Sequence, residues 1–152
     1  MTARVLVVDD IEANRRLLQA KLEAQYYTVM LAENGIEALS MVERSEPDII
    51  LLDVMMPGMD GYEVCQILKS QAETKDIPII FLTAKTQEDD ETKGLSLGAV
   101  DYITKPISPP ILKERVKNHL ILQASKDMLA KQNEILEEKV IQRTSQLAEI
   151  QD

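Results

Sequence analysis

Short apolar runs alternate with segments of helical spacing along most of this chain. Five runs of aliphatic and β-branched residues predict strands, at 5–8, 28–32, 48–53, 78–82 and 100–104. Between the runs, apolar residues recur every three or four positions, as on one face of a helix. After the first run these are Leu17, Leu18, Ala20, Leu22 and Ala24; after the second they are Ile36, Ala38, Leu39, Met41 and Val42. The polar segment 86–97 has the weakest helical pattern.

Strands that alternate with helices predict an α/β fold with a parallel sheet. Parallel strands need crossover connections, and these place helices on both faces of the sheet. The flavodoxin-like order 2-1-3-4-5 is a common way to wind five such units. We therefore expect a flavodoxin-like five-stranded parallel sheet with helices on both faces, followed by an extended C-terminal helix that begins near Ser108-Pro109.

The third predicted strand ends on a single carboxylate, Asp53, after the apolar run Ile49-Ile50-Leu51-Leu52. Pro57, Gly58 and Gly61 follow, so the strand cannot continue. Ligands of open α/β sheets bind at the carboxyl ends of the strands. Asp53 is therefore a candidate functional residue, although a carboxylate at this position could also simply cap the turn.

Composition narrows the class of partner. The 152 residues include 17 basic and 26 acidic side chains, a formal net charge of −9, which disfavours binding to nucleic acid or to an anionic membrane surface. The single cysteine, Cys65, cannot form an internal disulfide, and no apolar run approaches the ~18 residues of a membrane helix. These features predict a cytoplasmic protein.

Polar and charged residues end four of the five predicted strands. In the order 2-1-3-4-5, the ends of strands one, three, four and five surround one crevice. A coincidence of capping residues at four separate places is much less probable than a functional site. The residues brought together there are Asp9, Asp10, Asp53, Thr83 and Lys105.

Three carboxylates placed this close repel one another unless a cation is bound. Ligation by oxygen alone, without His or thiolate, favours Mg²⁺ or Mn²⁺. Asp10 and Asp53 are the expected carboxylate ligands, with a backbone carbonyl near Met55 as a third. Lys105 and Thr83 suit the oxygens of a phosphoryl group, which makes Asp53 a candidate nucleophile that forms an aspartyl phosphate.

These motifs resemble the receiver domain of two-component response regulators over about residues 3 to 119. The resemblance depends on Val7-Val8-Asp9-Asp10, on the segment 51–61, on Leu82-Thr83-Ala84, on Gly98-Ala99 and on Lys105-Pro106. In detail the chain is most similar to the first receivers of regulators with diguanylate cyclase or HD-GYP outputs. No motif of either output is present in the sequence.

The resemblance implies a phosphorylation-switched signalling domain, which is not an enzyme beyond its own phosphotransfer and dephosphorylation. Asp53 would accept the phosphoryl group from a sensor histidine kinase or phosphotransfer protein, and Asp9 and Asp10 would hold Mg²⁺. Thr83 and Lys105 would contact the phosphoryl group, with Lys105-Pro106 as a cis peptide. Tyr102 matches the family's switch aromatic.

The remainder of the chain, 120–152, contains neither Gly nor Pro and has leucines at heptad spacing. With Leu122, Leu129 and Leu136 at d, Asn133 and Val140 occupy a positions. We expect a receiver domain at 1–119 and a coiled-coil connector at 120–152 that forms a homodimer. A helix folded back on the receiver, or partly frayed, is the alternative.

Two other functions remain to be weighed. A stand-alone receiver that acts as an adaptor or phosphate sink fits the same motifs. A haloacid-dehalogenase-like phosphohydrolase also uses an aspartate nucleophile with Mg²⁺, but it requires an acid two residues later, where this chain has Met55. His119, the only histidine, could carry a phosphoryl group, although a surface or interface histidine is the simpler interpretation.

Overall fold

The computed structural model describes residues 2–84 and 93–151. The strands are β1 (Arg4–Val8), β2 (Thr28–Ala32), β3 (Ile49–Asp53), β4 (Ile79–Thr83) and β5 (Asp101–Thr104). The helices are α1 (Glu12–Glu23), α2 (Gly35–Ser45), α3 (Gly61–Lys69) and α5 (Pro109–Gln151). Most of the weakly predicted helix at 86–97 lies outside the described residues, and 93–96 are helical.

The five strands form one parallel sheet in the order β2-β1-β3-β4-β5, as predicted. Val8 of β1 pairs with Leu52 of β3, and Asp53 pairs with Leu82 of β4. Thr83 of β4 pairs with Thr104 of β5. This register brings the carboxyl ends of β1, β3, β4 and β5 to one edge of the sheet.

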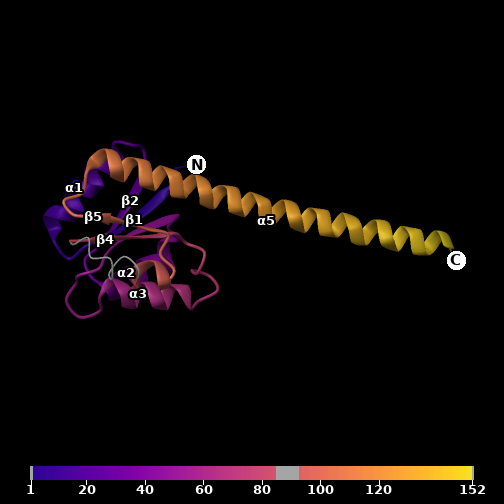
Figure 1. Cartoon of the computed structure of the whole chain (residues 1–152), viewed down its shortest axis with the longest axis horizontal. Coiled ribbons are helices and arrows are strands. Elements are labelled where there is room, and N and C mark those ends of the chain that lie inside the picture. The colour runs from indigo at the N-terminus through magenta and orange to yellow at the C-terminus, as the bar shows by residue number, and fades with distance from the viewer. Residues whose placement is uncertain (1, 85–92, 152) are drawn as a thin grey trace. The chain divides into compact units, whose positions relative to one another are not determined.

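Helices cover both faces of the sheet (Figure 1), and alternate residues of the strands pack into two separate cores. Leu6 and Val8 belong to the core covered by α2 and α3. Val5 and Val7 belong to the core covered by α1 and by the first turns of α5, where Leu112 and Val116 are buried. A sheet buried on both faces explains why β3 and β4 are apolar at nearly every position.

Not every apolar position of the helices is buried. Leu18 and Leu22 of α1 face the sheet, whereas Leu17, Ala20 and Ala24 are exposed. Ile36 of α2 is exposed as well. Residues one position apart lie about 100° apart around a helix, so a helix packed on a flat sheet buries a narrower stripe than the sequence suggested.

The chain divides into two compact units, Met1–Leu120 and Ile121–Asp152. In the second unit the backbone is helical through Gln151, and the side chains of 121–142 are exposed apart from the half-buried Gln123. No helix in the described part of the chain combines the length and the hydropathy needed to cross a membrane.

Candidate phosphoryl and metal site

The loop after β3 is folded back tightly over the strand end that carries Asp53. The Gly61 N–H donates to the Val54 carbonyl at 3.0 Å, and a Cβ atom on Gly61 would lie 2.9 Å from the Val54 Cα. Only glycine fits this close approach without a backbone shift. Asp60 then caps α3 by accepting from the Glu63 N–H at 2.9 Å. Gly61, which the sequence places soon after the strand, therefore has a steric role in this loop.

The structure brings together the three predicted carboxylates. Asp9, Asp10 and Asp53 each offer an oxygen, and these oxygens lie within 4.8 Å of one another. Asp9 and Asp53 are buried, whereas Asp10 is exposed. A set of three carboxylate oxygens without nitrogen or sulfur fits a hard divalent cation such as Mg²⁺, and the exposed Asp10 leaves one side open to solvent.

Lys105 lies between two of these acids. Its Nζ donates to Asp9 Oδ2 at 3.1 Å and is 3.3 Å from Asp53 Oδ1. The Lys105-Pro106 bond is cis, as the resemblance implied, and the Lys105 N–H donates to the Thr83 carbonyl at 2.6 Å. Thr83 is itself buried at the end of β4. The lysine and the threonine are thus held at the same strand edge as the acids.

Burial raises the pKa of the Asp53 carboxyl to about 6; Lys105 opposes this shift and the charge of Asp9 adds to it. Asp53 also accepts a bond from the Met55 N–H at 3.3 Å, which favours its ionised form. Burial alone would lower the pKa of the Lys105 ammonium, but Asp53 and Asp9 raise it overall. Without a cation, the site therefore carries more negative charge than Lys105 alone neutralises.

The other two predicted residues lie beside this group. Met55 is 72% exposed, and its backbone N–H bonds Asp53. Tyr102 is half-buried in β5 and packs against the core under α2 and α3. Its switch role stays a prediction from the resemblance.

Arg15 of α1, which the sequence pattern did not single out, reaches back to the site with its guanidinium. Arg15 Nη1 donates to the Asp9 carbonyl at 2.6 Å, and Nη2 lies 3.8 Å from the Glu33 carboxylate. Its side chain is 13% exposed. The only available signal was its distance of six residues from Asp9, which brings an Arg in the first turns of α1 back over the strand end.

His119 is also held more firmly than the sequence suggested. Its Nε2 lies 3.0 Å from Asp101 Oδ2, and Arg115 Nη1 donates to Asp101 Oδ1 at 2.6 Å. Burial would raise the pKa of the Asp101 carboxyl, but the bonds from His119 and Arg115 lower it overall. These contacts tie the first turns of α5 to β5.

Comparison with known proteins agrees with this geometry. Residues 5–117 match the family model of the response regulator receiver domain. The response regulator PleD of Caulobacter vibrioides is 55% identical over 118 residues, which are 78% of this chain and 26% of that protein. A probable cyclic di-GMP phosphodiesterase of Vibrio cholerae is 45% identical over 148 residues, which are 97% of this chain and 33% of that protein.

Solved structures give the same result. The crystal structure of a putative response regulator from Chloroflexus aurantiacus superposes with a TM-score of 0.77 at 36% identity, covering 80% of this chain and 99% of that one. The chain spans between a quarter and a third of the length of the two curated relatives. By its fold, by the family match and by these relatives, the chain belongs to the response regulator receiver domain family.

Proposed function

We propose that this chain is a phosphorylation-switched receiver in which Asp53 accepts a phosphoryl group and 120–152 transmits the signal by dimerisation. The observation that carries the proposal is the cluster of Asp9, Asp10 and Asp53 with the Lys105 ammonium beside two of them. If Lys105 served only to form a structural salt bridge, a single carboxylate would be enough to neutralise it. Three acids around one lysine leave a net negative site that suits a cation and a phosphoryl group.

In the proposed transfer, an Asp53 carboxylate oxygen attacks the phosphorus of a phosphohistidine. A phosphorus–oxygen bond to Asp53 forms while the bond from phosphorus to the imidazole nitrogen breaks, and that nitrogen retains the electron pair. Lys105 and the hydroxyl of Thr83 would stabilise the charge on the phosphoryl oxygens. Mg²⁺, or Mn²⁺, held by Asp9, Asp10, Asp53 and the Met55 carbonyl, would supply Lewis-acid neutralisation of the same charge.

The partner would be a sensor histidine kinase or a phosphotransfer protein. An apolar hollow beside the site supports a protein donor: it is a cavity of about 150 Å³ lined by Leu17, Lys105 and Pro106, among others. Leu17 is 51% exposed at its rim. The exposed apolar surface next to the nucleophile is a suitable contact for a donor that must place its phosphohistidine there. Such a partner would make the cytoplasm the site of action that we propose.

The tail supports the dimerisation part of the proposal. Leu122, Leu129, Leu136 and Val140 are all more than half exposed, which is costly for a helix that has no partner. The relative from Vibrio cholerae aligns over 148 residues, so the similarity extends well into the tail. We therefore interpret 120–152 as a connector from the receiver at 1–119 to an output domain, with a stand-alone adaptor or phosphate sink as the alternative.

Replacing Asp53 by Asn should abolish uptake of the phosphoryl group from acetyl phosphate in the presence of Mg²⁺, because the amide is not a nucleophile. Phosphate-affinity electrophoresis measures the product. Asp76→Asn, which neutralises an exposed acid outside the site, is the control and should be phosphorylated like the wild type. An Asp53→Asn protein that is still phosphorylated would place the acceptor elsewhere.

Replacing Asp53 by Asn, which removes one of the three neighbouring carboxylates, should also change how the free energy of unfolding depends on pH. The pKa of Asp53 is about 6 in the folded protein against a reference of 3.8, so the folded state binds this proton more tightly. The stabilisation from protonation is complete below about pH 4 and is lost as the pH rises to about 6. In EDTA at about pH 7.5, Asp53→Asn should unfold with a free energy up to about 3 kcal/mol higher than the wild type.

Urea denaturation across this pH range measures the effect. The difference between the two proteins should shrink between about pH 6 and pH 4. Adding Mg²⁺ at about pH 7.5 should stabilise the wild type more than the variant. If the difference in the free energy of unfolding does not vary with pH, the pKa of Asp53 is not raised in the folded protein.

A charge at the rim of the hollow should block a protein donor but not a small one. Leu17→Glu should slow phosphotransfer from the cognate kinase at least tenfold, about 1.4 kcal/mol, while uptake from acetyl phosphate stays unchanged. The matched control is Ile36→Glu, at an exposed position of α2 on the other face of the sheet. Normal transfer to Leu17→Glu would show that the donor docks elsewhere.

The a and d positions of 120–152 provide a test of the proposed dimer. A single Asn at an a position favours a paired, in-register dimer at a cost in stability. Asn133→Leu should raise the thermal stability of the dimer and allow higher oligomers, as measured by circular dichroism and light scattering. Glu138→Leu, on the outer side of the same heptad, is the control. A protein that is monomeric at tens of micromolar with and without beryllofluoride would refute the connector.

A further inference from the structure

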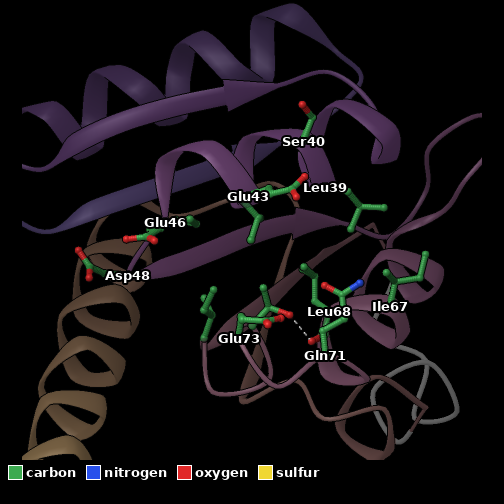
Figure 2. Close-up of a pocket in the computed structure, with 13 residues that line it drawn as sticks. Leu39, Ser40, Glu43, Glu46, Asp48, Ile67, Leu68, Gln71 and Glu73 are labelled. Carbon is green, nitrogen blue, oxygen red and sulfur yellow. Dashed lines mark hydrogen bonds between the residues drawn. The ribbon is translucent and has the colours of Figure 1, made fainter.

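A groove lies between α2 and α3, at the edge of the sheet opposite to Asp53. It has a volume of about 860 Å³, within the range of ligand-binding pockets. Its walls are the last turns of α2, the end of α3 and the segment that leads into β4 (Figure 2). β3 and β4 begin at this edge, whereas Asp53 and Thr83 end them. The groove is therefore separate from the phosphoryl site.

The charged side chains that line the groove are all acidic. They are Glu43, Glu46, Asp48 and Glu73, and no Lys, Arg or His is among the lining residues. Glu43 stands on α2, and Glu73 stands on the opposite wall (Figure 2). In the part of the chain that the structure describes, none of the four carboxylates forms a salt bridge. Asp48 accepts only a backbone bond, from the Arg4 N–H at 2.7 Å.

Each of the two helices beside the groove has a basic residue in its last turn, Arg44 in α2 and Lys69 in α3. α2 ends at Ser45 and α3 ends at Lys69, and residues of both last turns line the groove. The carboxyl end of a helix carries a partial negative charge. These basic side chains offset the partial charge of the helix ends, so the negative potential of the groove comes from its four acidic side chains.

The floor of the groove is apolar. Leu39, Ile67 and Ile77 are half-buried there, so each keeps part of its surface accessible from the groove. A ligand that fills this space must present apolar atoms to the floor and positive charge to the rim. Lys and Arg side chains beside aliphatic ones have both properties.

The geometry excludes a single metal ion as the occupant. Within the described residues, the only group of three or more acidic, His or Cys side chains with ligand atoms close enough for one ion is Asp9, Asp10 and Asp53. The groove acids are spread over a larger area, so an extended cation fits them better. Nucleic acid is excluded by the sign of the charge.

We propose that this groove is a docking site for a basic amphipathic segment of a partner protein. Lysine or arginine residues of that segment would pair with Glu43, Glu46, Asp48 and Glu73, and its aliphatic side chains would cover Leu39, Ile67 and Ile77. The site does not depend on phosphorylation chemistry, because no residue of the phosphoryl site lines it.

The test uses a synthetic peptide with the full chain. A fluorescent helical peptide of roughly 14 residues, about 21 Å long, carries Leu on one face and Lys on the other. Fluorescence anisotropy should show saturable binding that weakens with added salt. The variant Glu43→Gln, Glu73→Gln should bind at least fivefold more weakly.

The matched control is Glu63→Gln, Glu114→Gln, which removes the same charge at exposed positions outside the groove and should bind like the wild type. Methyl NMR should show shifts at Leu39, Ile67 and Ile77. Equal weakening in both double variants would mean that only net charge attracts the peptide. Shifts at Leu17 and Leu112 in place of the groove methyls would place it at the hollow beside Lys105.

The composition of the occupant is tested with two further probes. A peptide with Ser in place of Leu should bind at least fivefold more weakly, because it cannot cover the apolar floor. Spermidine at matched charge concentration should compete poorly for the same reason. If the Ser peptide binds as tightly as the Leu peptide, or if spermidine displaces it readily, the groove is a site for small polycations and the proposal is wrong.

Discussion

The site depends on the burial of like charges at the end of two adjacent strands. Asp9 and Asp53 are almost inaccessible to water, and Asp10 places a third carboxylate within reach of both. Lys105 offsets part of this repulsion by bonding Asp9 and approaching Asp53. The pKa of Asp53 nevertheless rises to about 6, so the lysine does not balance the site. The proposed function uses this incomplete neutralisation, because a net negative cluster of oxygen ligands suits a divalent cation.

The strands and the loops that follow them fix the positions of Asp9, Asp53 and Lys105. β1 and β3 are buried on both faces, which fixes the two acids with respect to each other. The chain enters the site from β5 through Lys105, whose backbone is anchored to Thr83. Arg15 anchors the end of β1 by bonding the Asp9 carbonyl. The polar groups are therefore positioned by the buried apolar strands and by hydrogen bonds between the strand ends.

The same receiver fold presents three chemically different surfaces. The carboxyl edge of the sheet holds the acids and Lys105, and the hollow lined by Leu17 adjoins it. The opposite edge holds an acidic groove between α2 and α3. The burial of apolar side chains changes along α5. Leu112 and Val116 are buried, whereas Leu122 and Leu129 are exposed. Exposed leucines at heptad spacing, such as Leu122 and Leu129, are suited to contact with a second helix.

Much of the fold followed from local patterns in the sequence. The strand positions, their order and the strand-end residues could be predicted, because buried parallel strands are continuous apolar runs and crossovers leave few topologies. The proximity of Asp9, Asp10, Asp53 and Lys105 followed from that order. The family match over residues 5–117 agrees with the fold that the sequence pattern predicted.

Other features were decided only by tertiary structure. Leu17 and Ile36 have the same local pattern as buried residues, and only the angle at which each helix meets the sheet exposes them. Arg15 and His119 acquire partners that are six and eighteen residues away in sequence, after the strand ends and helices are assembled. The acidic groove brings together two helix ends and a loop that no sequence pattern connects. Periodicity specifies which residues share a face, but the packing angle and the loop path decide what that face meets.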